Sequence, residues 1–483
     1  MLEAYAHNYL KNLLKKNSFA WPHNLTLSRL ISRSLRRKDR SFIQLETSDM
    51  KQSWPGVLVP LCLHSSEVVL VLTTSQRQRL LSFELPRLKL EGLHLSSWEG
   101  PMPPTGNQLW LLDHLEFFKA FCEGHLHSKQ LIIPEAELLS SRLRDCMSIK
   151  VCANHWDSLR RAHPSAASAL IKLHERLTRK LFAHATCVDG TVRMDFSETV
   201  VLMDLVAVLG HAPSPWPEVV AAIRHGWASW AELDHKLLDW CWNLKPLEPL
   251  KDLHIVFERN SLVLLSLTKQ NDFFLKQLEP FVGSFDVKVK LGDEFCQHQE
   301  PIQLFAPRRQ PLPNTEYFAE HLLDQCRRLI LGRKGITIIL LDDYQLLRQL
   351  TSELAAEFGK RVILESTSPE TNGVICCQSF WWMNFQDQLP IPEQLILGIL
   401  PFPSLELPLT AARVDAYKRQ GQDWFRDLLL PELLNLLPRL IWPVRKHHGR
   451  IAILDGRLRS RSWGERVLQS LEPWTPLERL LPD

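Results

Sequence analysis

The chain has 483 residues, of which 45% are apolar and 23% charged, and its 57 basic and 54 acidic side chains give a formal charge of +3. This composition excludes a mainly disordered chain, and the length predicts two to four domains at roughly 100–200 residues each. The near-neutral balance also excludes a protein that is basic throughout, so any surface for nucleic acid has to be local.

Residues 41–147 alternate short apolar runs with helical patterns. We expect strands at 41–47, 67–74, 108–114 and 130–133, and helices at 76–85, 115–123 and 137–146. Continuously apolar strands separated by helices are typical of a parallel sheet that is covered on both faces. The sequence therefore predicts a first α/β domain over residues 1–147, completed by residues 250–275.

Helical periodicity dominates between residues 148 and 249, most clearly at 167–182 and 196–209. Six of the sixteen tryptophans fall in this part of the chain: Trp156, Trp216, Trp227, Trp230, Trp240 and Trp242. Rings of this size favour the core of a helical subdomain, with a base-stacking surface as the alternative for one or two of them. We expect a helical insertion in the first domain.

Strand–helix alternation resumes near residue 261 and continues to a last expected strand at 450–454. Further strands are expected at 301–305, 336–341, 361–365, 374–377 and 395–400, with helices at 316–330, 344–358, 410–420, 431–441 and 463–471. The pattern predicts a second α/β domain over residues 276–483. The predicted fold class is thus α/β, with two parallel-sheet domains and a helical insertion in the first.

Cellular location is inferred from two features of the sequence. No run of about 18 uncharged apolar residues occurs, so we expect neither a transmembrane helix nor a membrane partner. The ten cysteines form no C-x-x-C pair, and Cys376 and Cys377 lie inside an apolar run. This usage is typical of a reducing compartment and predicts a cytoplasmic protein.

Self-sufficient active-site motifs are missing from the sequence. It contains no G-x-x-x-x-G-K-[ST], no G-x-G-x-x-G, no H-E-x-x-H and no G-x-S-x-G. Cys122, His125 and His127 are close together but lack an evident fourth ligand, so no metal site is predicted. Asp342 and Asp343 follow an expected strand, where capping a helix is a more common use of a carboxylate than binding a cation.

Residues 26–40 form the clearest local concentration of charge. Apolar residues share one face of an expected helix, and the opposite face carries Arg29, Arg33, Arg36, Arg37 and Arg40. Contact with nucleic-acid phosphates is the functional interpretation of this basic helix. The alternative is a solvated face whose charges are partly paired within the protein.

The C-terminal part carries a series of segments in a distinctive order. It reads Leu-Pro-Phe-Pro at 400–403, Pro-Arg-Leu-Ile at 438–441, Ile-Leu-Asp-Gly-Arg-Leu at 453–458 and Trp-Gly at 463–464. In this order the chain resembles the DinG-type and XPD-type superfamily 2 DNA helicases over about residues 374–473. The resemblance implies two RecA-like domains that bind single-stranded or forked DNA between them and use ATP and Mg²⁺ as cofactors.

The N-terminal half fits the same family by segment spacing. Residues 46–60 have the length of the family's nucleotide-binding segment, with Glu46 and Pro60 kept at its ends. Thr73 and Thr74 follow the next expected strand, where the family contacts the DNA backbone. Residues 134–137 stand where the family has D-E-A-H, and residues 148–249 where it has its arch domain.

Several positions depart from the family where it handles phosphate and magnesium. Ser53 stands at the position of the phosphate-binding lysine and Trp54 at that of the magnesium ligand, while Lys51 comes two residues early. Pro134 replaces the metal-binding aspartate, although Glu135 is kept at the position of the residue that orients water. Phosphoryl transfer depends almost wholly on positioning and charge neutralisation, so these changes predict a degenerate nucleotide site.

Two further family features are altered. Residues 382–385 lack both carboxylates of the E-G-x-D segment, and the finger segment keeps Arg439 but has Trp442 in place of its last arginine. The iron–sulfur form of the family needs four cysteines, but only Cys62 and Cys122 lie in that interval, so no iron–sulfur cluster is expected.

Three functions remain open from the sequence. The leading hypothesis is a DNA-binding relative that no longer hydrolyses ATP, in which Glu46, Lys51 and Ser53 are remnants of the nucleotide site and Glu135 and Arg439 remnants of the catalytic machinery. Its partners would be DNA and proteins of repair or replication. The alternatives are an active ATP-dependent DNA helicase and a protein-interaction scaffold that binds no nucleic acid.

Overall fold

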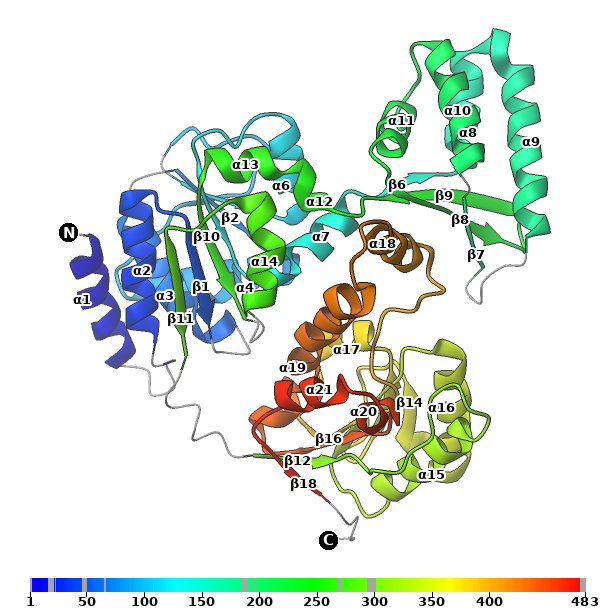
Figure 1. Cartoon of the computed structure of the whole chain (residues 1–483). Coiled ribbons are helices and arrows are strands. Elements are labelled where there is room, and N and C mark those ends of the chain that lie inside the picture. Colours follow the sequence, from blue (N-terminus) through cyan, green and yellow to red (C-terminus); the bar gives the residue numbers. More distant parts are fainter. Residues whose placement is uncertain are drawn as a thin grey trace. The chain divides into compact units, whose positions relative to one another are not determined.

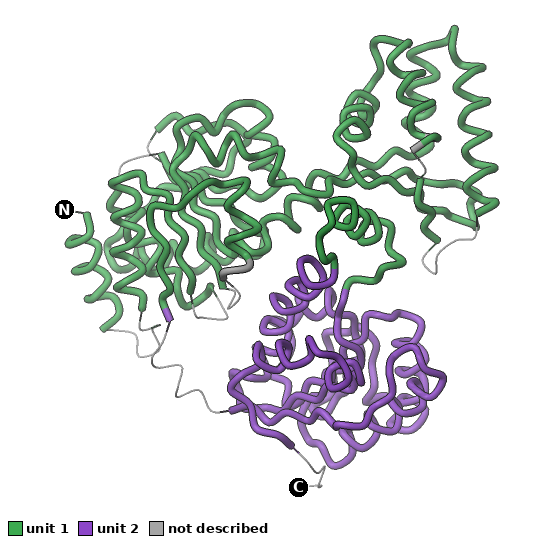
Figure 2. Tube along the Cα trace, in the orientation of Figure 1, with its two compact units in different colours: residues 1–291, 403–424 green, residues 292–402, 425–483 purple. Residues whose placement is uncertain are grey.

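The computed structural model describes residues 2–15, 21, 23–45, 50–64, 67–106, 108–184, 190–194, 196–267, 271–292 and 301–477. The chain divides into two compact units, shown in different colours in Figure 2. Unit 1 comprises residues 1–291 and 403–424, and unit 2 comprises residues 292–402 and 425–483. Within the described residues, no helix is long and apolar enough to cross a membrane.

A seven-stranded parallel sheet forms the centre of unit 1, in the order β11-β1-β10-β5-β2-β4-β3. Its strands are β1 (Ser41–Leu45), β2 (Val68–Val71), β3 (Ser97–Trp98), β4 (Leu109–Leu112), β5 (Gln130–Ile133), β10 (Ser261–Ser266) and β11 (Val287–Leu291). The central strands are buried along their whole length. This confirms the prediction of a parallel sheet from continuously apolar runs.

Helices cover both faces of this sheet (Figure 1). One face packs Ile43 and Leu70 against α1 (Leu2–Lys15), α2 (Asn24–Arg37) and α3 (Trp54–Leu63). The other face packs Phe42 and Val69 in a core with α6 (His114–Cys122), α7 (Leu139–Cys146), α13 (His254–Arg259) and α14 (Asn271–Val282). Alternate residues of one strand thus enter two different cores, as the pleat requires.

The first sheet extends further along the chain than expected. β11 pairs with β1 from Ser41↔Val287 to Leu45↔Leu291, so the domain boundary lies after residue 291 and not after residue 275. β11 is an edge strand whose exposed lysines alternate with apolar residues. This short alternation is a weaker signal than the apolar runs of the central strands.

The insertion carries the expected helices together with a sheet that helical periodicity did not predict. Four strands, in the order β6-β9-β8-β7, form an antiparallel sheet. The elements are β6 (Ile149–Val151), α8 (Ala153–Ala162), α9 (Ala167–Ala183), β7 (Thr191–Arg193), α10 (Phe196–Leu209), α11 (Trp216–Arg224), β8 (Ala228–Asp234) and β9 (Asp239–Lys245).

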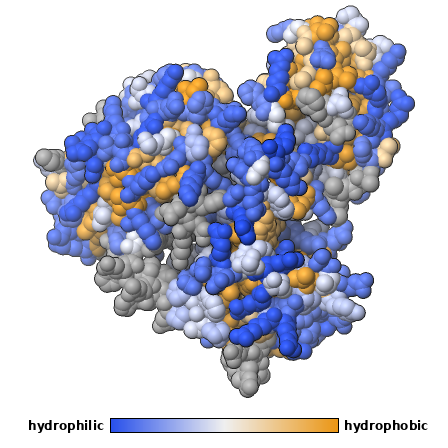
Figure 3. All heavy atoms as spheres, viewed as in Figure 1, coloured by the Kyte–Doolittle hydropathy of each residue, from blue (hydrophilic) through white to orange (hydrophobic). Residues whose placement is uncertain are grey.

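The tryptophans of the insertion lie mainly in its core. Trp156, Trp216, Trp240 and Trp242 are buried between the sheet and the helices, and the Trp156 ring lies 4.8 Å from that of Trp216 and 6.2 Å from that of Trp240 between centroids. The core interpretation therefore applies to these four. Apolar side chains also reach the surface over α10, the orange area in that part of Figure 3, where Val208 is 85% exposed.

A helix from the C-terminal half of the sequence belongs to unit 1. α18 (Pro408–Arg419) packs Ala412 against Ala228 and Trp230 of β8. Arg193 of β7 donates to a carboxylate oxygen of Asp415 at 2.6 Å. The segment 403–424 therefore belongs to unit 1, although all of residues 276–483 were expected in the second domain.

A second seven-stranded parallel sheet forms unit 2, in the order β14-β15-β13-β16-β17-β12-β18. Its strands are β12 (Ile302–Phe305), β13 (Ile336–Leu340), β14 (Val362–Leu364), β15 (Val374–Cys377), β16 (Pro392–Leu397), β17 (Arg450–Ile453) and β18 (Trp474–Pro476). The helices are α15 (Phe318–Ile330), α16 (Tyr344–Phe358), α17 (Ser379–Phe385), α19 (Leu430–Lys446), α20 (Arg457–Ser460) and α21 (Gly464–Ser470).

Candidate functional site

The segment after β1 was expected to hold the remnants of a nucleotide site. Glu46 and the three residues that follow it lie outside the described residues. The chain then forms a 3₁₀ turn over Met50–Gln52, which contains the half-buried Lys51, and enters α3 at Trp54. The described residues at the expected position of the phosphates are therefore those of this 3₁₀ turn and of the first turn of α3.

Ser53 and Trp54 are built into the core at this point. The Ser53 side chain is fully buried, and its hydroxyl donates a hydrogen bond to the carbonyl oxygen of Met50 at 2.9 Å. The Trp54 ring is 1% exposed and packs with Met50 in the core beneath α1 and α2. Neither side chain points to solvent, where it could meet a phosphate or a magnesium ion.

Asn24 of α2 covers the N-terminal end of α3. Its side-chain oxygen accepts a hydrogen bond from the Gly56 backbone N–H at 3.0 Å, and its amide nitrogen donates to the Gln52 carbonyl at 2.9 Å and to the Trp21 carbonyl at 3.1 Å. The Asn24 side chain is completely buried. The backbone N–H of Gly56 is therefore already hydrogen-bonded to a buried side chain of the protein.

The first N–H groups of a helix bind phosphate because they have no partner within the helix. In α3 the second residue is Pro55, which has no N–H, and the third is Gly56, whose N–H is donated to Asn24. A Cβ at position 56 would lie 2.9 Å from the Asn24 carbonyl oxygen, so α2 and α3 are in close contact here. Two of the first three donors of this helix are thus unavailable to an anion.

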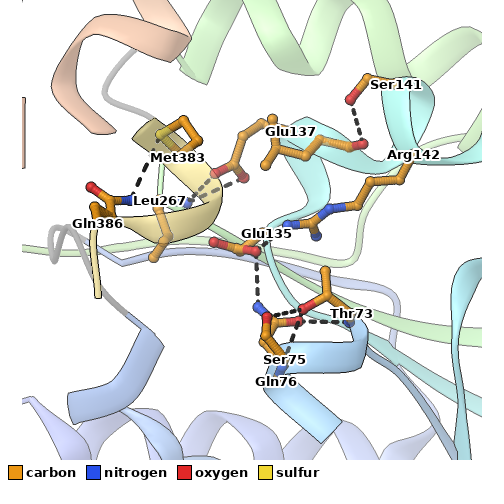
Figure 4. Close-up of polar contacts among 11 residues, drawn as sticks. Thr73, Ser75, Gln76, Glu135, Glu137, Ser141, Arg142, Leu267, Met383 and Gln386 are labelled. Carbon is orange, nitrogen blue, oxygen red and sulfur yellow. Dashed lines mark hydrogen bonds and ion pairs between the residues drawn. The ribbon is translucent and has the colours of Figure 1, made fainter. Parts of the chain in front are cut away.

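Glu135 follows β5 at the carboxyl end of the sheet, with a positive φ of 51°. Its carboxylate accepts a hydrogen bond from the Gln76 side-chain amide at 2.8 Å and forms an ion pair with Arg142 of α7, as Figure 4 shows. Glu135 and Arg142 are both mostly buried, with side chains 13% and 20% exposed. This carboxylate therefore links β5 to α4 (Thr74–Arg79) and to α7.

Gln76 connects Thr73 to the Glu135 carboxylate (Figure 4). The Thr73 hydroxyl accepts a hydrogen bond from the Gln76 backbone N–H at 3.2 Å, and the Gln76 side-chain oxygen accepts one from the Thr73 N–H at 3.0 Å. This reciprocal capping box begins α4 and fixes Thr73 at the edge of the sheet. Thr74 follows on the first turn and is exposed.

His114 completes the charged surroundings of Glu135. Burial first, and then the positive charge of Arg142, lower the pKa of this imidazole to about 4. The imidazole is therefore neutral at neutral pH and adds no second positive charge beside Arg142. Glu137 is used differently, since its carboxylate accepts the backbone N–H of Leu267 at 3.2 Å and so joins the ends of β5 and β10.

Two arginines of the basic helix α2 are paired with α1. The Arg36 guanidinium donates to the Glu3 carboxylate at 2.9 Å, and this hydrogen bond holds the pKa of Glu3 below its ordinary value. An Arg29 nitrogen lies 3.4 Å from His7 Nε2. Helix α1 supplies both partners and was not expected from the sequence.

The remaining arginines of this predicted surface differ in their environment. Arg33 pairs with Asp39 at 3.4 Å. Arg40 donates to backbone carbonyls at the ends of α13 and α14, and its own N–H is accepted by Asp286 at 2.8 Å. Arg37 is exposed at the end of α2. These contacts correspond to the alternative interpretation, a charged face that is partly paired within the protein.

The predicted residues of unit 2 lie in a well-packed region. Arg439 is half-buried on α19, and the neighbouring Leu440 carbonyl accepts a hydrogen bond from the indole of buried Trp382 at 2.9 Å.

Asp343 caps α16 by accepting a hydrogen bond from the Leu346 N–H at 3.0 Å, which confirms the capping interpretation. Among the described residues, no group of three His, Cys, Asp or Glu side chains is arranged to hold a metal ion.

Retained family positions of unit 2 are explained by the fold. The Asp455 carboxylate is fully buried, accepts the Leu400 N–H at 2.9 Å and forms an ion pair with Arg457 at 2.7 Å. The Arg457 guanidinium lies 5.3 Å from the centre of the Phe402 ring, which in turn packs edge-on against Trp463 at 5.2 Å. These residues hold the start and the end of the C-terminal segment together.

Sequence reasoning missed Asn24, Gln76 and Arg142. A capping-box pattern, Thr73 followed three residues later by a glutamine, could have identified Gln76. Asn24 contacts a backbone group 28 residues away, and no local pattern contains that contact. Arg142 stands seven positions beyond Glu135 and could have been identified only once α7 was placed.

Comparisons with known proteins agree with the resemblance in the sequence. No family profile matches the chain. A stretch of 188 residues is 29% identical to an ATP-dependent DNA helicase YoaA of Haemophilus influenzae, covering 36% of this chain and 29% of that protein. A protein of the same name from Escherichia coli is 25% identical over 179 residues, covering 34% of this chain and 28% of its own length. The match thus spans less than a third of these curated relatives.

Solved structures show the fold over nearly the whole chain. An XPD helicase superposes with a TM-score of 0.60 at 10% identity, covering 95% of this chain and 100% of its own. Xpd4 of S. tokodaii gives a TM-score of 0.61 at 11% identity, covering 92% and 98%. The chain therefore has two RecA-like domains and resembles the DinG/XPD-type superfamily 2 DNA helicases.

Proposed function

We propose that this protein binds DNA with its RecA-like units and does not hydrolyse ATP. The single observation that carries the proposal is the closed N-terminal end of α3, where Asn24 takes the Gly56 N–H and Pro55 offers none. In the helicases that the chain resembles, this end of the helix cradles the nucleotide phosphates. Here the same backbone is part of a buried contact between two helices.

Opening this contact for a nucleotide is unfavourable. The Asn24 side chain makes three hydrogen bonds inside the protein, each with a net value of about 1 kcal/mol, and leaving them unmade costs more. A nucleotide bound there would also meet Ser53 and Trp54, which supply neither a cation nor a magnesium ligand. The binding energy available to ATP is therefore small and the cost of access is large.

The retained Glu135 supports the same conclusion. Its carboxylate is held by Arg142 and Gln76, and the residue before it is Pro134, which cannot bind a magnesium ion. A base that orients water acts beside a bound metal ion, and Pro134 supplies no ligand for one. The contacts of Glu135 instead suit a structural carboxylate that joins β5 to the adjacent helices.

DNA binding is proposed from the family resemblance and from the position of Thr73 and Thr74. Thr74 is exposed at the first turn of α4, and Thr73 is fixed there by its capping box. Single-stranded or forked DNA is the proposed ligand, and we infer a role beside repair or replication proteins in the cytoplasm. Without hydrolysis the protein would act as a DNA-bound platform.

Two titrations test this proposal. Isothermal calorimetry with Mg·ATP is expected to show no binding, and fluorescence anisotropy with a labelled single strand is expected to show binding that weakens as salt is raised. Tight Mg·ATP binding would favour an active ATP-dependent DNA helicase instead. Failure to bind any single-stranded or forked DNA would favour a protein-interaction scaffold.

A further inference from the structure

Two loops of unit 2 carry exposed arginines that lie outside the segments on which the family resemblance rests. One loop follows β12 and includes Arg308 and Arg309, and the other, which contains the short helix α20, follows β17 and includes Arg459 and Arg461. All four side chains are exposed, and none forms an ion pair with a described carboxylate, in contrast to Arg33 and Arg36 of the basic helix, which pair with Asp39 and Glu3.

The two loops are neighbours in the fold. β12 and β17 are adjacent parallel strands, so both loops leave the same edge of the sheet. The Gln310 side chain donates to the Ile453 carbonyl at 3.0 Å and to the Pro307 carbonyl at 3.1 Å, which joins the first loop to the end of β17. Any Cβ at Gly456 would overlap the backbone carbonyls of Gln310 and Pro311, so the loops lie directly against each other.

The local charge is strongly positive. The carboxylate of Asp455 is buried and neutralised by Arg457, which leaves Glu316 and Glu465 as the exposed acids of the two loop segments. Against these stand the four arginines and Arg466, all exposed. Like charges on neighbouring segments repel one another, and a polyanion relieves that repulsion.

We propose that these two loops form a binding site for the phosphodiester backbone of a DNA strand, with Arg308, Arg309, Arg459 and Arg461 as its phosphate contacts. The inference rests on the proposed function, because it assigns a place in unit 2 to the DNA that the protein is proposed to bind. Guanidinium groups suit this ligand because their fork of N–H donors matches two phosphate oxygens at once. The exposed Ser460 and Ser462 add hydroxyl donors between them.

The magnitude follows from counterion release. Each phosphate contact on a single strand contributes about 0.7 to the slope of log K against log salt, which at ~0.1 M salt is a factor of about five in affinity. Loss of two contacts is therefore expected to weaken binding about 25-fold and to reduce the slope by about 1.4.

The experiment compares two double variants with the parent by fluorescence anisotropy on a labelled oligodeoxythymidylate over a salt series. R308Q/R309Q and R459Q/R461Q are each expected to bind about 25-fold more weakly and to lower the salt slope by about 1.4. R308K/R309K keeps the charge but loses the guanidinium fork, so it is expected to keep the salt slope of the parent and to lose less affinity than R308Q/R309Q.

R327Q/R328Q is the matched control on α15 of the same unit, because it removes the same charge from arginines already paired with Glu357 at 2.5 Å and Asp324 at 3.0 Å. It is expected to leave the dissociation constant and the slope unchanged.

Three results would overturn the inference. If the parent binds DNA and both glutamine variants bind equally well, the cluster is not a DNA contact, while the proposed function stands. An equal loss in the α15 control would show an effect of net charge alone. If the parent binds no DNA, the proposed function fails and the role of the cluster fails with it. If the same arginines bind an acidic protein and the parent binds no DNA, the inference is overturned in the same way.

Discussion

Replacement of Asn24 by alanine tests the closed end of α3 most directly. The substitution removes three buried hydrogen bonds and leaves the Gly56 N–H and the carbonyls of Gln52 and Trp21 without those partners. At about 1 kcal/mol for each bond, and more where a buried group stays unsatisfied, the free energy of unfolding should fall by about 2–4 kcal/mol.

Urea denaturation, with the free energy extrapolated to water, measures this change. Asn154 of α8 is exposed, so N154A is a matched control that should change the free energy of unfolding by no more than about 0.5 kcal/mol. N24A is also expected to gain no affinity for Mg·ATP, because Ser53 and Trp54 remain in place. A free energy within about 0.5 kcal/mol of the parent would refute the reasoning, and new nucleotide binding would show that Asn24 alone closes the site and that Ser53 and Trp54 do not exclude the nucleotide.

Three further predictions concern unit 1. Because the pKa of His114 is lowered to about 4, the unfolded state binds its proton first as the pH falls. This contributes up to about 3 kcal/mol of stability above pH 6.5 that is lost between pH 6.5 and 4, and urea denaturation of H114N should show a smaller pH dependence. E135Q leaves Arg142 without its ionised partner and should lower the free energy of unfolding by about 1–3 kcal/mol, whereas no change would mean that the pair is not structural. W230A removes a buried ring against α18, so amide exchange at 408–419 should accelerate, and unchanged exchange would contradict the assigned contact.

The sequence predicted the elements whose patterns are local and strong. β5, β15 and α16 begin and end at the expected residues because their apolar runs or helical period are bounded by clear turn and capping residues. The sheet of the insertion was missed although Trp240, Trp242 and Leu244 alternate along β9, because helical segments on both sides outweighed a short period of two.

The site could be predicted only in part. Spacing against the family identified Glu135, Thr73 and Ser53, and the structure brings Glu135 and Thr73 together through Gln76. What these residues contact was not predictable, since Asn24 reaches Gly56 across 32 positions in the sequence. Long-range hydrogen bonds of this kind leave no period or spacing in the chain.

The central claim is tested most directly by ATP turnover of the purified full chain, with and without single-stranded DNA. An E135Q preparation made in parallel measures any contaminating ATPase. The account predicts the same background rate in both preparations and no stimulation by DNA. DNA-stimulated turnover that is present in the parent and lost in E135Q would contradict it, because Glu135 would then be acting as the base of a working motor.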